Sequence, residues 1–218
     1  MKRLYKVIVV FSLAAFLLLT TATVAPAQTA GPFYVGIFGG LVVPDDMEFD
    51  DGWSSWEEEM DESWAIGAKF GYIIPPTKWL AVELEYTYLA DQDYGETFSP
   101  VDNYSGDFSA HNVMANLLFR YPQGKIHPYV GFGLGISTAT LEENLTLDGV
   151  SVYNYDDDDT AFASQFIAGV NFEIAPNISA DLAYKYFYSE YDFNDYYGID
   201  TDVEAGNHLF TAGINFHF

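Results

Sequence analysis

The sequence predicts an all-β fold: an eight-stranded antiparallel up-and-down transmembrane β-barrel with long acidic extracellular loops and short periplasmic turns. Eight segments alternate large apolar residues with small or polar ones, which is the period of a strand whose two faces see different surroundings. Short turns and long loops alternate between these segments, as they do in up-and-down barrels. The third observation is that most of the acidic residues fall in the long loops.

The start of the chain has the three-part layout of a secretory signal peptide. Three bases, at positions 2, 3 and 6, precede the apolar run VIVVFSLAAFLLL, and Ala-Pro-Ala at 25–27 forms a small-residue cleavage site. The apolar run is too short for a membrane anchor. We therefore expect residues 1–27 to be removed and residues 28–218 to form one barrel domain. The chain has no cysteine, so disulfides cannot stabilise this domain.

The alternating segments define the expected strands. Between residues 64 and 74, for example, Ile66 and Phe70 lie on one face, and Gly67 and Lys69 lie on the other. Large apolar groups dominate one face of each segment, and glycine, alanine and polar residues dominate the opposite face. The eight expected strands are 33–43, 64–74, 80–88, 112–121, 129–136, 162–174, 178–188 and 207–218.

The connections between these strands are of two kinds. Three are tight turns, at 74–78, 122–127 and 175–177, and they contain the proline, glycine and asparagine that suit fixed or positive φ angles. The others are long, and together they hold 28 of the 32 acidic residues and no lysine or arginine. The four expected long loops are 44–62, 90–108, 141–159 and 189–205.

The remaining acidic residues and three of the bases share the small, polar face of their strands. An eight-stranded barrel is just wide enough to be filled by side chains, so the large apolar face would overfill the lumen. We expect that face to contact lipid, and the strand charges to become mutual partners inside. A soluble barrel with the faces reversed is the alternative. The expected ionic network consists of Lys69, Glu83, Glu85, Arg120, Glu173, Asp181 and Lys185.

Several segments carry a resemblance to a known group of proteins. The signal peptide, the first strand PFYVGIFGG, the central VMANLLFRYPQGKIHPYVGFGLGIS and the final LFTAGINFHF resemble the eight-stranded outer-membrane barrels related to the opacity proteins and to the transmembrane domain of outer membrane protein A. This resemblance implies a location in the cell outer membrane and contact with outer-membrane lipid. It also implies that the barrel assembly machinery recognises the terminal residues Phe210, Ile214, Phe216 and Phe218.

The loops are the expected working surface, in a structural or surface-interaction role. A filled lumen predicts a plugged barrel, with a small ion-conducting barrel as an alternative. Clustered carboxylates suit divalent cations or a basic ligand, although the weak metal candidates Asp156, Asp157, Asp158 and Asp159 lack the spacing of a calcium loop. The net charge of -24 argues against nucleic acid as a partner.

An enzyme is the rival class of function. Ser109, His111 and Glu142 share the lipid-facing side of two adjacent expected strands, and such residues form triads that cleave acyl esters. The arrangement is similar in outline to the outer-membrane lipid A deacylases, but their motif places histidine before serine, and here the order is reversed. No oxyanion donor is evident. We expect no enzymatic activity, and no cofactor, because the sequence has no cofactor motif.

Overall fold

The computed structural model describes residues 31–50, 55–58, 60–99, 102–148, 150–194 and 200–218. The expected signal peptide, residues 1–27, lies outside the described residues. Within the described ranges, no helix is long and apolar enough to cross a membrane.

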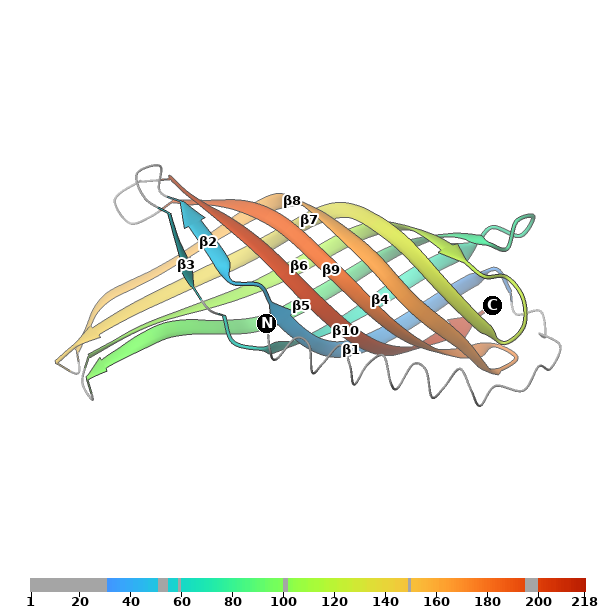
Figure 1. Cartoon of the computed structure of the whole chain (residues 1–218), viewed down its shortest axis with the longest axis horizontal. Coiled ribbons are helices and arrows are strands. Elements are labelled where there is room, and N and C mark those ends of the chain that lie inside the picture. Colours follow the sequence, from blue (N-terminus) through green and yellow to red (C-terminus); the bar gives the residue numbers. More distant parts are fainter. Residues whose placement is uncertain (1–30, 51–54, 59, 100–101, 149, 195–199) are drawn as a thin grey trace.

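Eight of the described strands form a closed ring (Figure 1). Each strand pairs antiparallel with the next, and the ring closes where the first strand pairs with the last, from Tyr34 opposite His217 to Pro44 opposite Asn207. The predicted fold class is confirmed. Closure gives the strands of the ring partners on both sides, as a lipid environment requires. The strands of the ring are β1 (Phe33–Pro44), β4 (Ser63–Ile73), β5 (Leu80–Ser99), β6 (Asp102–Arg120), β7 (Ile126–Leu147), β8 (Val150–Ala175), β9 (Ile178–Asn194) and β10 (Asp200–His217).

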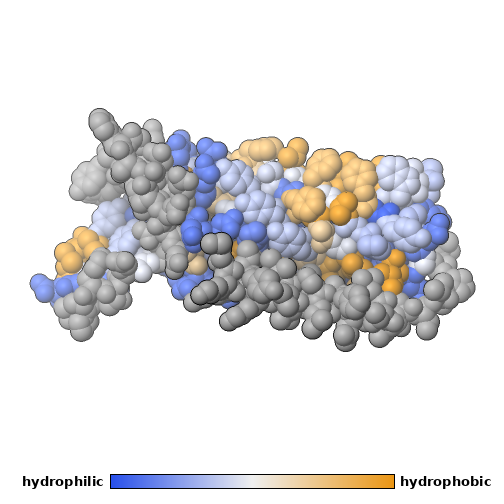
Figure 2. Space-filling model, viewed as in Figure 1, coloured by the Kyte–Doolittle hydropathy of each residue, from blue (hydrophilic) through white to orange (hydrophobic). Residues whose placement is uncertain are grey.

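The wall of the barrel is apolar outside, and near the turn end its inner face is polar. On β4, Ile66 is 54% exposed, whereas Lys69 is 8% exposed. Figure 2 shows the same division at larger scale, with hydrophobic side chains over the middle of the barrel and more hydrophilic residues toward its two ends. A soluble barrel would bury its large apolar face. The arrangement of the faces is therefore the one expected for a barrel in lipid.

The turn end of the barrel is compact. Gly124 in the turn between β6 and β7 has a φ of 78°, a conformation that glycine adopts without steric cost. The last residue is fixed at this end as well, because the Phe218 N–H donates to the Phe33 carbonyl at 2.9 Å and the Phe33 N–H donates to the Phe218 carbonyl at 3.2 Å. In outer-membrane barrels the short turns face the periplasm.

The other end of the barrel differs from the prediction, because most of the expected long loops continue the strands. β7 has 22 residues and β8 has 26, whereas about 10 residues suffice to cross a membrane. These extensions have polar residues on both faces, so they lack the apolar alternation from which strands are predicted, yet their main chains still pair. The segments expected as loops at 90–108, 141–159 and 189–205 are therefore largely paired strand.

Beyond the rim the sheet separates into two parts (Figure 1). The pairing of β8 with β9 ends at Ala163 and Ser189. On one side of this point, β2 (Met47–Asp50) and β3 (Ser55–Glu58) extend the sheet from β10. On the other side stand four paired extensions, which we call the protruding sheet. The protruding sheet comprises residues 90–99 of β5, 102–109 of β6, 140–147 of β7 and 150–158 of β8.

Candidate functional site

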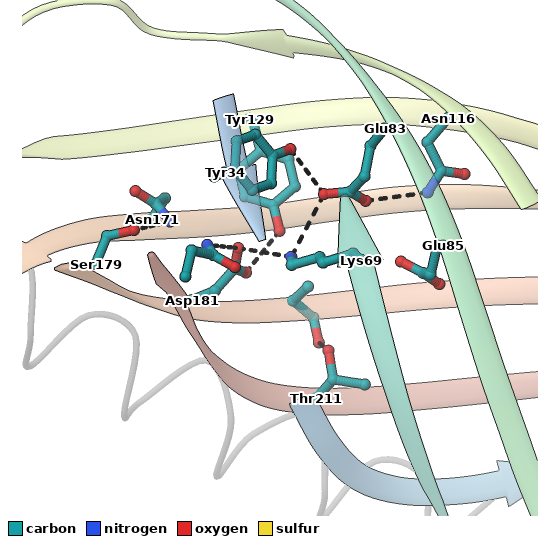
Figure 3. Close-up of polar contacts among 12 residues, drawn as sticks. Tyr34, Lys69, Glu83, Glu85, Asn116, Tyr129, Asn171, Ser179, Asp181 and Thr211 are labelled. Atoms are coloured by element: carbon teal, nitrogen blue, oxygen red, sulfur yellow. Dashed lines mark hydrogen bonds and ion pairs between the residues drawn. The ribbon is translucent and has the colours of Figure 1, made fainter. Parts of the chain in front are cut away.

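The lumen of the barrel is filled by two kinds of side chain at two levels. Charged residues occupy the level nearer the turn end, which we call the ionic half, and Figure 3 shows their contacts. Apolar residues occupy the level nearer the protruding sheet, which we call the apolar half. The buried charged residues of the ionic half are Lys69, Glu83, Glu85, Asp181 and Lys185.

Lys69 lies between two carboxylates in the ionic half. Its Nζ is 3.0 Å from Asp181 Oδ2 and 3.6 Å from Glu83 Oε2. Lys69 comes from β4, Glu83 from the neighbouring β5, and Asp181 from β9 on another part of the ring. The ammonium group thus links strands across the lumen. Charges removed from water are tolerated only when their partners are well placed.

Neutral donors complete the coordination of both carboxylates. The Tyr34 hydroxyl donates to Glu83 at 2.7 Å, and Asn116 donates to the other oxygen of Glu83 at 3.1 Å. Asp181 accepts in the same way from the Tyr129 hydroxyl at 2.7 Å. Each carboxylate therefore has a lysine and a tyrosine as partners, which offsets the cost of burying its charge.

A second ion pair lies on the side of the ionic half toward the apolar half. Lys185 Nζ is 2.6 Å from Glu85 Oε1, and Thr87 donates to the same oxygen at 3.1 Å. The Lys185 ammonium also lies 4.0 Å from the centre of the Phe38 ring, within the range of a cation–π contact.

Glycines make room for the two tyrosines of the ionic half. A Cβ atom at Gly71 would overlap the ring of Tyr34, and a Cβ atom at Gly169 would overlap the ring of Tyr129. The small residues that the sequence places on the inner face are thus the complement of large rings on adjacent strands.

The apolar half closes the lumen toward the protruding sheet. Phe108 and Tyr191 pack edge to face with ring centroids 5.6 Å apart, and both side chains are buried. The Tyr191 hydroxyl forms a hydrogen bond with Ser137 at 2.6 Å. The buried members of the apolar half are Val42, Ala65, Leu89, Phe108, Ala110, Met114, Ala139, Leu141, Ala163, Phe187, Tyr191, Val203, Ala205 and Leu209.

Two members of the expected ionic network lie apart from it. Glu173 contacts His127, with Oε1 2.9 Å from Nε2. Arg120 lies at the turn end of the lumen, beside the ionic half. Sequence reasoning missed Tyr34, Tyr129 and His127 as partners of the charges. The two tyrosines were recognisable by their position on the small, polar face, but His127 fell within an expected turn.

The candidate triad residues lie on the outer face of β6 and β7. Their order along the strands does not suit proton transfer from the serine through the histidine. Ser109 is opposite Thr140, and Glu142 is opposite Asp107, so Ser109 lies between His111 and Glu142 along the strands. A triad needs the histidine between the other two. The His111 Nδ1 instead forms a hydrogen bond with the Tyr86 hydroxyl at 2.8 Å.

The protruding sheet carries a row of four carboxylates across its four strands. Asp93 is opposite Asp107, Asp107 is opposite Glu142, and Glu142 is opposite Asp156. A hydrogen bond with Asp93, burial and the surrounding carboxylates raise the pKa of Asp107 from 3.8 to about 6. Like charges placed directly opposite each other on neighbouring strands destabilise the pairing, so this row is a functional candidate.

The metal candidates of β8 do not converge on one point. Asp156 and Asp158 are exposed on one face, and Asp157 and Asp159, half-buried, are on the other, because successive strand residues point to opposite sides. Among the described residues, no group of three or more histidine, cysteine or acidic side chains has the geometry to hold a metal ion.

The residues of the expected assembly signal lie on the last strand and at its end. Ile214, Phe216 and Phe218 are exposed on the outer face, where they form part of the apolar wall. Phe210 packs against Tyr184 with ring centroids 5.3 Å apart.

This barrel is similar to a known protein family and to solved structures. Residues 11–218 match the family described as "Outer membrane protein beta-barrel domain". Neisserial surface protein A is similar in structure, with 20% identity, a TM-score of 0.52, and coverage of 88% of this chain and 100% of that chain. The outer membrane protein OprG from Pseudomonas aeruginosa has 15% identity, a TM-score of 0.51 and coverage of 88% and 100%. No curated protein matches the sequence.

Proposed function

Because the chain belongs to the family of outer membrane protein β-barrel domains, we propose that it is a closed barrel that presents the protruding sheet as a docking surface outside the cell. The observation that carries this proposal is an open strand edge. Residues 150–158 of β8 pair with β7 on one side, and no ladder joins this segment to another described strand on its other side. Nearer the rim, β9 contacts β8 through the Asp192 N–H, which donates to Asp159, and the Ser189 hydroxyl, which donates to the Phe162 carbonyl.

An open edge is a template for another extended chain. The main-chain N–H and C=O groups along such an edge can pair with a peptide that adds as a further strand. Natural proteins usually shorten or cover such edges. Here the edge belongs to β8, the longest described strand of the barrel. β8 is held in place by its pairing with β7, which in turn pairs with β6. An incoming peptide therefore meets a preformed strand.

The charge of the protruding sheet favours a basic partner. It contains the row formed by Asp93, Asp107, Glu142 and Asp156, and no lysine or arginine. Complementary charge raises the association rate and excludes acidic competitors. We therefore infer that the ligand is a basic polypeptide segment in extended conformation. Divalent cations are a weaker choice, because the aspartates of β8 point to opposite faces.

The filled lumen supports a role outside the barrel over ion conduction. Phe108 and Tyr191 are buried within the apolar half, and a continuous water path would have to pass these rings. Catalysis by Ser109, His111 and Glu142 is also less favoured, because the serine lies between the other two residues.

A binding experiment with a designed peptide tests the proposal. The mature barrel in lipid nanodiscs is titrated with a short peptide of alternating lysine and threonine, and with a copy in which every backbone amide is methylated. The methylated copy keeps the charge but has no backbone N–H donor on either edge, so it cannot add as a strand. We expect the first peptide to bind at least about tenfold more tightly, a difference of about 1.4 kcal/mol. Equal binding of both peptides, or no binding of either, would overturn the proposal.

Charge variants of β8 provide a matched control. Asp156→Asn with Asp158→Asn removes two carboxylates from the outer face, whereas Asp157→Asn with Asp159→Asn removes two from the other face. We expect the first pair of substitutions to weaken peptide binding more than the second. Equal weakening would show that net charge, and not the outer face, attracts the peptide.

A further inference from the structure

A cavity of about 220 Å³ opens at the turn end of the lumen. Its lining includes Lys78, Arg120, His127, Glu173 and His217. A smaller cavity of about 30 Å³ shares Arg120 and His217 with it and reaches deeper, to Glu83 and Asp181. The larger cavity thus lies between the periplasmic opening and the ionic half, with Arg120 at the junction.

Arg120 lines both cavities and has no ion-pair partner among the described residues. Lys69 and Lys185 both have carboxylate partners. In the part of the chain that the structure describes, no carboxylate oxygen lies within 4.0 Å of the Arg120 guanidinium. A guanidinium removed from bulk water without a partner is costly, and its planar fork of donors matches the oxygens of a carboxylate or phosphate.

The acidic residue of the cavity is already engaged. Glu173 accepts from His127 Nε2 at 2.9 Å, while His127 Nδ1 lies 2.9 Å from the carbonyl oxygen of Tyr121. Both neighbours are acceptors, and the His127 ring is held between them. The Glu173 carboxylate is therefore engaged by His127, whereas Arg120 and Lys78 have no ion-pair partner among the described residues.

A chain of hydrogen bonds engages one ring nitrogen of His217 and leaves the other without a partner. Asn171 donates to the Ser179 hydroxyl at 3.0 Å, and that hydroxyl lies 2.8 Å from His217 Nε2. The second ring nitrogen, Nδ1, is the unused polar atom of this chain. This Nδ1 atom is shielded from solvent and has no partner among the described residues.

From these observations we propose that the turn-end cavity binds a small oxyanion, a carboxylate or phosphate group that enters from the periplasm, with Arg120 as its principal ligand. The unpaired guanidinium supplies charge and a bidentate fork, and His217, whose Nδ1 has no partner among the described residues, lines the same cavity. The site is independent of the protruding sheet, which is at the opposite end of the barrel (Figure 1).

The experiment is a titration of the mature barrel in a nonionic detergent with inorganic phosphate and, separately, with acetate. The readout is the NMR signals of the Arg120 side-chain Nε–H and of the Asn171 and His217 amides. We expect saturable shifts with at least one anion. Arg120→Gln should weaken binding at least about tenfold, or about 1.4 kcal/mol, and Arg120→Lys should restore part of the loss, since it keeps the charge without the fork.

Lys125→Gln is the matched control, because it removes one positive charge from the same end of the barrel at an exposed position outside the cavity. Binding should be unchanged in this variant. Absence of saturable shifts in the wild-type barrel, or equal loss in Lys125→Gln and Arg120→Gln, would overturn the proposal. A further arm compares nanodiscs of anionic and zwitterionic lipid without added anion. Shifts of the same signals in the anionic discs alone would identify a lipid headgroup as the source of the oxyanion.

Discussion

The ionic and apolar halves of the lumen are both filled by side chains, but ion pairs hold the first together and ring packing holds the second. Both must fill a barrel of eight strands, which is only wide enough for side chains. In the ionic half, Lys69 is held by two carboxylates, and each carboxylate has a tyrosine donor. In the apolar half, Phe108 and Tyr191 pack through their rings.

The difference lies in how each half responds to a defect. A buried ion pair gains little over apolar packing while it is complete, but it becomes strongly unfavourable when one partner is removed. Apolar packing loses stability in proportion to the contacts and volume that are removed. The ionic half is therefore the level at which single substitutions should have the largest effects, and the apolar half is the level at which large buried rings fill the lumen.

The largest expected effect comes from Lys69→Met. This change leaves the buried carboxylates of Glu83 and Asp181 without their common cation, which should lower the free energy of unfolding by about 3–5 kcal/mol. Urea unfolding of the barrel in lipid vesicles measures the loss. Adding Glu83→Gln and Asp181→Asn to the same chain should restore much of the stability. A Lys69→Met barrel as stable as the wild type would show that the ion pairs are not required.

Phe108→Ala tests the apolar half by the same unfolding measurement. Removal of a fully buried ring should cost about 3 kcal/mol, through lost contacts and the cavity that remains. The cost should not depend on pH, since no charge loses its partner. A cost near zero would mean that the neighbouring side chains collapse into the space or that the half is loosely packed.

One substitution made in both halves compares them directly. Tyr129→Phe removes a hydrogen bond to the buried Asp181 carboxylate and should cost about 2 kcal/mol, because hydrogen bonds to charged groups are the stronger kind. Tyr191→Phe removes hydrogen bonds to the neutral hydroxyls of Ser137 and Ser189 and should cost about 1 kcal/mol. Equal losses would contradict the distinction between the halves.

The smallest effect is expected outside the lumen, at Asp107 in the protruding sheet. The pKa of this residue rises from 3.8 to about 6 in the folded chain. A raised folded pKa means that its contribution to stability is present below about pH 4 and is lost as the pH rises through about 6. Asp107→Asn should remove this dependence, with a change below about 1 kcal/mol because the group is only half-buried and water screens its interactions.

Hydrogen exchange at the β5 and β6 amides of the protruding sheet, corrected for intrinsic rates, measures the Asp107 effect. Protection in the wild type should be greater at about pH 4 than at about pH 7. Glu190→Gln, on β9 and outside the acidic row, is the control that should keep the wild-type dependence. The same pH dependence in Asp107→Asn would assign the effect to another group.

The barrel itself was predictable from the sequence because its two faces differ so strongly. Alternation in segments such as 64–74 fixed which side chains turn inward, and the structure confirms the fold class. The extensions were missed because residues such as Asp156–Asp159 give no apolar period to a strand that has water on both sides. The pairing of Glu173 with His127 and the isolation of Arg120 depend on turn geometry and register, which alternation does not encode.

Ion conduction across a planar lipid bilayer tests the central claim most directly, namely that the lumen is closed and that the barrel acts through its surfaces. The wild-type barrel should insert without producing steady current steps. The double variant Phe108→Ala with Tyr191→Ala, which removes both rings of the apolar half, should show a greater current at the same protein density. Steady, reproducible current steps in the wild type would contradict the account and make ion conduction the favoured function.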